Sequence, residues 1–369
     1  MSATITRRGC PITALDVRTY RIPTADPHES DGTAVWDATT LVLVELHAGG
    51  QTGLGYTYAD TAAAAVIHDE LRPVLDGADA LETGKRFADM QTAIRNMGRD
   101  GIASMAISAV DIALWDLRGK ICDVPVCTML GVARDAVPVY GSGGFTSYSL
   151  EELREQLGGW VKAGIPRVKM KVGRDAHADV ERVRNAREAI GDAELFVDAN
   201  GAYSRKEAMH FAEAFARYGV TWFEEPVYHQ DFEGLREVRE RTPAGMEVSV
   251  GEYGYGLYHF WRMLQAQTAD CLQADATRCG GFSGLLAVDG LCQAAMMPLS
   301  THCAPYVHLH AALACKMLRH SEYFFDHVRI ERMFFDGTSD PIDGALEADT
   351  SRPGIGLELR RADAARYER

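Results

Sequence analysis

Seven short apolar runs in the second half of the chain each close on an ionisable residue. These residues are Lys171, Asp198, Glu224, Glu252, Asp275, His302 and Glu322. They recur roughly every 25 residues, which is the length of one strand-plus-helix unit of a (β/α)8 barrel. Because the C-terminal ends of the strands in such a barrel converge on one mouth, residues one unit apart become neighbours in space. The spacing therefore predicts an α/β fold, a (β/α)8 TIM barrel with an active site at its mouth.

The barrel is expected over residues 131–325, where short apolar runs alternate with signals for the start of a helix. Eight candidate strands cover 137–141, 167–172, 194–199, 222–225, 247–251, 271–275, 297–301 and 321–325. Ser149-x-x-Glu152 and Ser204-x-x-Glu207 are capping boxes, in which the hydroxyl and the carboxylate satisfy free amides of a first helical turn. Both fall where a barrel helix is expected to begin.

Residues 1–130 have a different pattern and predict an α+β unit. Residues 13–22 and 39–47 alternate as strands do, glycines then mark a turn and a third strand, and 60–120 is Ala-rich with helical spacing of apolar residues. We therefore expect an antiparallel meander followed by helices. The tail, 326–369, is turn-rich and alternating again, and we expect it to pack back on this first unit.

Composition excludes several classes of partner. The formal charge of −14 disfavours nucleic acid and anionic membranes, because no basic patch offsets it. No apolar stretch has the length of a signal peptide or a membrane span. The eight cysteines form no Cys-x-x-Cys pair and several lie in apolar runs, which predicts reduced thiols. We expect a cytoplasmic enzyme acting on a small molecule.

Three carboxylates end successive strands and are expected to meet at the rim. Asp198, Glu224 and Glu252 cannot share a cleft unpaired, and a hard divalent cation with oxygen ligands removes their repulsion. Mg²⁺ also keeps open positions for substrate oxygens. For any one carboxylate a cap or a surface ion pair is the commoner role, but three in phase favour a Mg²⁺ site.

Two lysines close the second strand on the same side of it. Strand alternation points Lys169 and Lys171 into the barrel, with Met170 facing outward. Two neighbouring ammonium groups lower one another's pKa, so Lys171 is expected to act as a general base near neutral pH. A pair of surface lysines is the usual alternative, and the apolar surroundings argue against it.

The last three strands carry an acid–base group and a further carboxyl. Asp275 and His302 end neighbouring strands, so the carboxylate is expected to orient the imidazole opposite Lys171. Glu322 is expected to be buried and protonated, as a hydrogen-bond donor. A metal ion with a base on each side suits removal of the proton alpha to a carboxylate, giving an enediolate that must be stabilised as its charge develops.

The polar stretch 23–37 is long for a hairpin connection and is interpreted as a functional loop over the barrel mouth. His28 and Asp31 in this loop suit a polyhydroxylated substrate. Because any exposed loop is polar, an ordinary surface loop is the alternative interpretation.

The set of motifs resembles the enolase superfamily, specifically its mandelate racemase subgroup. The shared features span nearly the whole chain and are Asp111–Leu117, Lys169-x-Lys171, Asp198-Ala199-Asn200, Glu224-Glu225-Pro226, Gly251-Glu252, Asp275 and His302. The resemblance implies a capping domain, built from the residues before about 130 and the C-terminal tail, that closes a modified barrel. It implies the following roles: Mg²⁺ ligands Asp198, Glu224 and Glu252; base Lys171 with modulator Lys169; acid–base pair His302–Asp275; electrophilic carboxyl Glu322; substrate contact Asn200.

Within that subgroup the resemblance favours an acid-sugar dehydratase that gives a 2-keto-3-deoxy acid. The nearest alternative is a racemase or epimerase of a 2-hydroxy acid, using the same Lys171 and His302. Muconate cycloisomerase-like relatives usually carry a lysine where Asp275 stands, which disfavours that branch. Two other classes remain open, a Schiff-base aldolase using Lys171 and a non-catalytic solute-binding barrel. The resemblance also suggests a homo-oligomer.

Overall fold

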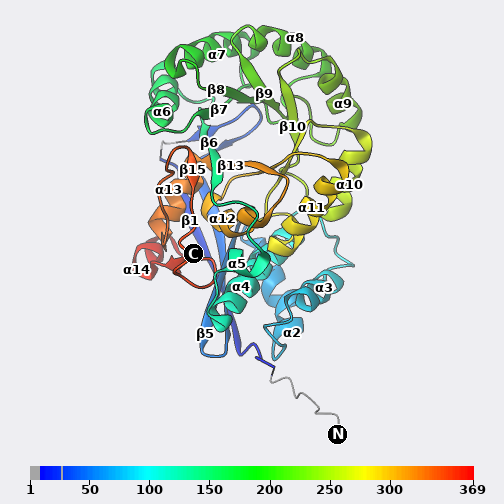
Figure 1. Cartoon of the computed structure of the whole chain (residues 1–369), viewed down its shortest axis with the longest axis vertical. Helices are drawn as coiled ribbons and strands as arrows, with labels where there is room; N and C mark the ends of the chain where they lie inside the picture. Colours follow the sequence, from blue (N-terminus) through cyan, green and yellow to red (C-terminus); the bar gives the residue numbers. More distant parts are fainter. Residues whose placement is uncertain (1–8, 26–27) are drawn as a thin grey trace.

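A computed structural model describes residues 9–25 and 28–369, and its larger part is a closed barrel of eight parallel strands (Figure 1). Neighbouring strands pair in chain order, and β13 pairs with β6 to close the ring. The strands are β6 (Val137–Gly143), β7 (Arg167–Lys171), β8 (Glu194–Asp198), β9 (Val220–Glu224), β10 (Glu247–Val250), β11 (Cys271–Ala274), β12 (Leu299–Thr301) and β13 (Leu318–Phe324). The predicted barrel is confirmed, although β13 begins three residues before the expected strand.

Helices follow the strands and cover the outside of the barrel (Figure 1). They are α6 (Leu150–Lys162), α7 (Ala176–Ile190), α8 (Arg205–Ala216), α9 (Phe232–Arg241), α10 (Leu257–Ala266), α11 (Gly281–Ala295), α12 (Pro305–Ala314) and α13 (Phe325–Phe334). Both predicted capping boxes are present, at Ser149 for α6 and at Ser204 for α8. Met170 packs in the main hydrophobic core, so the lysines on either side of it point into the barrel.

The N-terminal unit is an antiparallel meander covered by helices. Its sheet has the order β1 (Ala14–Pro23), β4 (Ala38–Ala48), β5 (Gln51–Tyr58). The helices are α1 (Ala62–Val66), a π-helical turn (Ile67–Leu71), α2 (Arg72–Leu75), α3 (Thr83–Ala93), α4 (Ile102–Cys122) and α5 (Val126–Leu130). Helix α4 lies directly on β5. The two elements are so close at Gly55 that an added Cβ would come within 2.1 Å of the Ala109 carbonyl oxygen. The predicted order of strands and then helices is confirmed.

The C-terminal segment returns to the N-terminal sheet. Strand β15 (Ala345–Leu346) pairs antiparallel with β6, and β14 (Phe335–Asp336) pairs with β16 (Glu358–Leu359). Beyond β16 the chain forms α14 (Arg361–Ala364) and a 3₁₀ turn (Ala365–Tyr367). Arg361 donates to Glu45 on β4 at 2.5 Å, and the Tyr56 hydroxyl on β5 donates to Glu331 on α13 at 2.7 Å. The exact boundaries at 130 and 325 stay a prediction.

The stretch 23–37, predicted as a loop, includes regular structure in its described part. It contains a minimal hairpin, β2 (Glu29–Ser30) with β3 (Val35–Trp36), while residues 26–27 lie outside the described residues. The Ser30 hydroxyl is 2.6 Å from that of Thr146 beyond β6, which fixes the hairpin to the C-terminal rim of the barrel. The two strands are too short to show the alternation by which strands are predicted.

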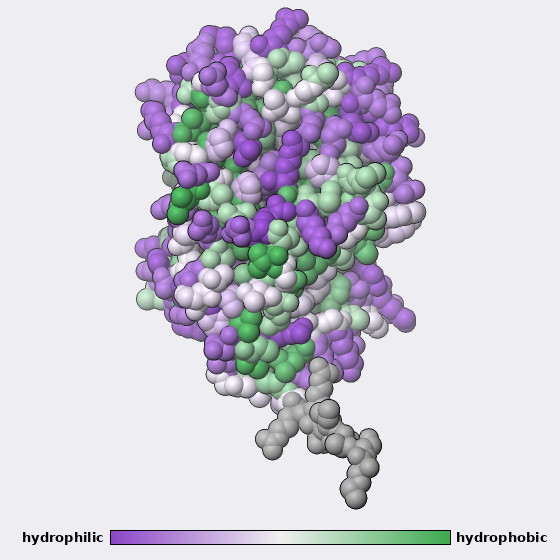
Figure 2. Space-filling model, in the orientation of Figure 1, coloured by the Kyte–Doolittle hydropathy of each residue, from purple (hydrophilic) through white to green (hydrophobic). Residues whose placement is uncertain are grey.

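Hydrophilic side chains cover most of the barrel helices on the face seen in Figure 2, and hydrophobic ones appear there as separate patches. Among the described residues, no helix has both the length and the apolar character that a membrane span requires. All eight cysteines, each within the described part of the chain, are free thiols, as predicted.

Candidate active site

The ionisable residues of the seven runs meet at the C-terminal end of the barrel. Lys171, Asp198 and Glu224 are the last residues of β7, β8 and β9. Asp275 and His302 directly follow β11 and β12, whereas Glu252 lies two residues beyond β10 and Glu322 lies inside β13. All seven side chains are buried, as is Lys169. The structure therefore brings every predicted metal and acid–base residue into one cluster.

The three predicted metal ligands lie close enough together to bind a single ion. They are Asp198, Glu224 and Glu252. One carboxylate oxygen from each lies within 4.8 Å of the other two. Within residues 9–25 and 28–369, no group donates a hydrogen bond to the buried Oε2 of Glu252. Three anionic oxygens and an unsatisfied acceptor suit a hard divalent cation such as Mg²⁺. Burial and the charge of Asp198 raise the pKa of Glu224 well above its ordinary value, which reflects the repulsion within this group.

Lys169 is the cationic centre of the cluster. Its Nζ lies 2.5 Å from Oε1 of Glu224, 2.8 Å from Oε1 of Glu322 and 3.3 Å from Oδ2 of Asp198. The side chain is fully buried, so these ion pairs are what offset its desolvation. Lys169 therefore links two of the candidate metal ligands to the carboxylate on β13.

Lys171 has a higher pKa than the sequence predicted. Burial lowers the pKa of Lys171, and the Lys169 charge also lowers it, but the Asp198 carboxylate 2.5 Å from its Nζ, together with the carboxylates of Glu252 and Glu224, outweighs both. The net pKa is raised above the ordinary value for lysine. The prediction of a lowered pKa was wrong because it counted only the neighbouring ammonium group and left out the carboxylates of the next strands.

Glu322 is held as an anion, which also corrects the sequence-based prediction. Burial favours its protonated form, yet Lys169 above all holds the pKa of Glu322 well below its ordinary value. Its Oε1 accepts from the Ser142 hydroxyl at 2.5 Å, and its Oε2 accepts from the amide of Cys303 at 2.8 Å. A carboxyl that accepts on both oxygens cannot serve as the predicted protonated donor.

His302 and Asp275 form the expected pair. Nδ1 of His302 lies 2.9 Å from Oδ2 of Asp275, and its Nε2 lies 3.4 Å from Oε2 of Glu252. Burial opposes the charge of Asp275, but the hydrogen bond from His302 and its charge hold the pKa of this carboxyl below its ordinary value. The carboxylate thus fixes Nδ1 and leaves Nε2 directed toward the candidate metal ligands.

Arg278 is a site residue that the sequence analysis missed. Its Nη1 lies 3.5 Å from Oε1 of Glu252, and its Nε lies 3.6 Å from Oδ2 of Asp275. The guanidinium also stacks over the Tyr253 ring, 5.3 Å from the ring centroid. Arg278 follows the end of β11 by four residues, and a search of the residues just beyond each strand would have found it.

The three predicted substrate contacts lie in different surroundings. The backbone N–H of Asn200 donates to Oδ1 of Asp198 at 2.9 Å, and the buried side-chain Oδ1 of Asn200 accepts no hydrogen bond from the described residues. Asp31 accepts from the amides of Thr33 and Ala34, so its carboxylate shapes the turn between β2 and β3. His28 is exposed. Asn200 adjoins the cluster, and substrate contact by any of the three stays a prediction.

Two family models match most of the chain. Residues 13–131 match the N-terminal domain of mandelate racemase and muconate lactonizing enzyme, and residues 152–364 match the enolase C-terminal domain-like family. The chain belongs to the mandelate racemase and muconate lactonizing enzyme family of the enolase superfamily. The predicted resemblance, the barrel and the additional N-terminal domain are confirmed together.

Characterised members of the family are similar over most of their length. A 3,6-anhydro-alpha-L-galactonate cycloisomerase of Streptomyces coelicolor is 34% identical, over 92% of this chain and 94% of that protein. An L-talarate/galactarate dehydratase of Salmonella typhimurium is 30% identical, over 86% of this chain and 80% of that protein. Both relatives are enzymes of sugar acids. From its similarity to these dehydratases and cycloisomerases we conclude that this chain is an enzyme as well.

Solved structures have the same fold. A mandelate racemase/muconate lactonizing enzyme-like protein of Rubrobacter xylanophilus is 53% identical with a TM-score of 0.95, over 97% of this chain and all of that one. A racemase of Streptomyces coelicolor with bound magnesium is 31% identical with a TM-score of 0.91, over 97% of this chain and all of that one. Two domains in the same arrangement are therefore common to this chain and these relatives.

Proposed function

We propose that this protein is a Mg²⁺-dependent dehydratase that removes the proton alpha to the carboxylate of a sugar acid and expels the β-hydroxyl as water. One observation carries the proposal. Lys171 contacts Asp198, and His302 contacts Glu252, so the two bases adjoin different members of the same carboxylate cluster. A substrate carboxylate held at that cluster has its α-carbon between a lysine and an imidazole.

Asp198, Glu224 and Glu252 would hold the ion, as their convergence and the unsatisfied Glu252 oxygen indicate. When bound, Mg²⁺ supplies positive charge that competes with Lys171 for Asp198 and stabilises the negative charge growing on the substrate carboxylate. Relatives solved with magnesium, including one in complex with L-glucarate, support this cofactor and this substrate class.

The proton transfers use residues of this chain. Lys171 or His302 accepts the α-proton at its side-chain nitrogen, and the electron pair of the broken C–H bond spreads onto the substrate carboxylate. The pair then forms the α,β double bond as the β C–O bond breaks, and protonated His302 delivers its Nε2 proton to the departing hydroxyl. The enol that remains becomes a 2-keto-3-deoxy acid.

Asp275 and Arg278 position this machinery. Asp275 keeps Nε2 of His302 available by holding Nδ1. Arg278 fixes the carboxylates of both Asp275 and Glu252, so the acid–base group and the metal ligand keep a constant separation. The unsatisfied Oδ1 of Asn200 supports a role for this residue as acceptor of a hydrogen bond from a substrate hydroxyl.

A panel of aldonates and aldarates tests the proposal. Purified protein with Mg²⁺ is expected to release a 2-keto acid from at least one member, detected by a carbonyl reagent, and to stop when EDTA is added. Retained activity in EDTA together with borohydride trapping of Lys171 would instead indicate a Schiff-base aldolase. A protein that binds a sugar acid but never turns it over, with or without Lys171, would be a solute-binding barrel.

Racemisation or epimerisation is the second candidate, because the same two bases suffice for it. If His302 accepts the α-proton and Lys171 returns one to the other face, no C–O bond breaks. Uptake of deuterium from D₂O into recovered acid without any keto product would favour this alternative. The related cycloisomerases keep a third outcome open, in which the product is an isomer with a changed ring.

A further inference from the structure

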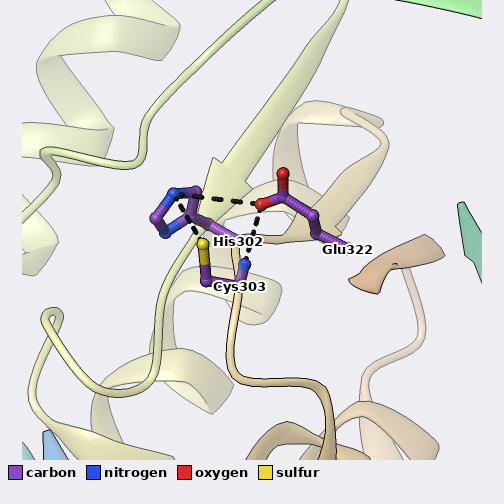
Figure 3. A group of neighbouring side chains, drawn as sticks. All are labelled: His302, Cys303 and Glu322. Atoms are coloured by element: carbon purple, nitrogen blue, oxygen red, sulfur yellow. Dashed lines mark hydrogen bonds and ion pairs between the residues drawn. The ribbon is translucent and has the colours of Figure 1, made fainter. Parts of the chain in front are cut away.

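A second group of possible metal ligands lies beside the carboxylate cluster (Figure 3). It consists of a nitrogen of His302, the sulfur of Cys303 and an oxygen of Glu322. Sγ of Cys303 lies 3.2 Å from Nε2 of His302, and Oε2 of Glu322 lies 3.9 Å from the same nitrogen. All three ligating atoms are within 4.8 Å of one another, and all three residues are buried. None of the roles proposed above uses the thiol.

The backbone places this thiol in an uncommon position. Successive residues at the end of a strand normally point to opposite sides, which would separate Cys303 from His302. Here Cys303 and Ala304 both adopt left-handed conformations, with φ of 50° and 41°. These two residues turn the chain sharply, so that Sγ comes back to the imidazole of the preceding residue. Strained backbone of this kind is concentrated at functional sites.

The donor set matches zinc. A thiolate, an imidazole and a carboxylate are the three side-chain ligand types that Zn²⁺ takes, commonly with a water in the fourth tetrahedral position. Tetrahedral zinc with normal bond lengths holds such donors about 3.4–3.6 Å apart, close to the separations of 3.2 and 3.9 Å seen here. A hard ion such as Mg²⁺ gains little from sulfur and prefers the neighbouring oxygen cluster.

The surrounding contacts orient the ligands. Asp275 accepts at Nδ1 of His302, which leaves Nε2 as the coordinating nitrogen, and a carboxylate behind a histidine is the usual support for a zinc ligand. Oε1 of Glu322 is held by Ser142 and Lys169. Oε2 accepts from the Cys303 amide and is the oxygen that lies 3.9 Å from Nε2 of His302.

We propose that His302, Cys303 and Glu322 form a zinc site separate from the Mg²⁺ ligands, and that zinc bound there inhibits the enzyme. On binding, the S–H bond of Cys303 breaks, its proton leaves to solvent and a Zn–S bond forms, with no change of oxidation state. The same ion occupies the lone pair at Nε2 of His302. The inhibitory part rests on the proposed function, because it requires His302 to carry a proton during turnover.

Cobalt tests the site without any need for turnover. Co²⁺ added to the Mg²⁺-loaded protein is expected to give a near-ultraviolet thiolate-to-metal charge-transfer band, which oxygen ligands alone do not produce. The band should be absent in C303S and in C303A and retained in C122S, which removes the exposed cysteine. A band of equal strength in C303S, or no band in the native protein, would overturn the site.

Zinc titration tests its affinity and its effect. The dissociation constant for Zn²⁺ should rise in C303S by more than the roughly 10- to 100-fold that loss of a group merely orienting a ligand costs. Zinc should inhibit the native enzyme and C122S, with EDTA followed by fresh Mg²⁺ restoring activity, while C303S resists. Equal inhibition of C303S that excess Mg²⁺ relieves would place the zinc on the carboxylate cluster and contradict the inhibitory role.

The cobalt band and the turnover of sugar acids together distinguish failure of this proposal from failure of the proposed function. If no sugar acid is turned over but the cobalt band depends on Cys303, the site stands and the proposed function fails. If a sugar acid is dehydrated and the band is missing, the reverse holds. Thermal unfolding of C303S and C303A without added metal shows whether each variant is folded, and C303A removes the hydroxyl that serine would offer to a metal.

Discussion

The imidazole of His302 is held by Asp275 across the gap between two adjacent strands, with Nδ1 and Oδ2 2.9 Å apart. Both residues directly follow the last residue of their strand, β12 and β11, so the strand register sets their separation. The barrel thereby fixes which ring nitrogen is left for chemistry. That dependence leads to a direct test of the pair.

Replacing Asp275 by Asn keeps the size of the side chain and removes its charge. In D275N the amide cannot support protonated His302, so kcat for the sugar acid should fall roughly 10- to 100-fold, as for other groups that support a histidine. Isothermal titration should show Mg²⁺ affinity within a few-fold of the native value. Unchanged kcat in D275N would remove Asp275 from the acid–base machinery.

Glu252 offers the sharpest test of the metal site. Its buried Oε2 accepts no hydrogen bond from the described residues, so E252Q should fold with an undiminished thermal midpoint. An amide oxygen is a weaker ligand for Mg²⁺ than a carboxylate. Mg²⁺ affinity measured by calorimetry should therefore fall at least roughly tenfold, because loss of a group that only supports a metal ligand already costs about 10- to 100-fold. Native Mg²⁺ affinity in E252Q would exclude Glu252 as a ligand.

Arg278 connects the two halves of the site, and its variants should affect both. R278M removes the charge that faces Glu252 and Asp275, so Mg²⁺ affinity and kcat should fall together, each roughly 10- to 100-fold. R278K keeps the charge without the planar fork and should recover part of each loss. Loss of kcat with unchanged Mg²⁺ affinity would contradict a link between the two.

His310 on α12 gives a pH dependence of stability that is unrelated to the metal site. Burial lowers the pKa of His310 to about 4, and its Nδ1 accepts from the amide of Cys127 at 3.3 Å, which requires an unprotonated nitrogen. The unfolded chain, with an ordinary histidine pKa of about 6.5, binds more protons between pH 6.5 and 4. This contribution to stability is therefore lost as the pH falls through that window.

The variant H310N keeps an acceptor near Nδ1 and removes the titration. Between pH 7 and pH 5 the free energy of unfolding of the native protein should drop by about 2 kcal/mol more than that of H310N. Denaturant unfolding at the two pH values measures the difference. Equal losses in both proteins would show that His310 does not stay neutral in the fold.

The strand ends were predictable because two periodicities coincide there. Apolar runs close on Asp198, Glu224 and Lys171 at the spacing of one barrel unit, and the closed parallel sheet then leaves little freedom in where these side chains meet. The family motifs carried the same information, and the comparisons confirm the family. Strand limits differed mainly at β13, which begins at Leu318, three residues before the predicted strand 321–325.

Properties set by contacts across the barrel were not predictable from spacing. The pKa values of Lys171 and Glu322 depend on which opposite charge lies nearest. Asp198 raises the pKa of Lys171 and Lys169 lowers that of Glu322, contrary to both predictions. Neither the Arg278 contacts nor the approach of Cys303 to His302 leaves a periodic signal, because both depend on loop backbone after the strands.

Exchange of the α-proton with D₂O tests the central claim most directly, that Lys171 and His302 act on one carbon at the carboxylate cluster. Mass spectrometry of recovered sugar acid should show Mg²⁺-dependent deuterium uptake or turnover by the native enzyme. The double variant K171A/H302N should lose both by at least the roughly 10²- to 10⁴-fold that a general acid–base contributes, while still binding Mg²⁺. A folded, Mg²⁺-loaded double variant that exchanges the α-proton at the native rate would contradict the account.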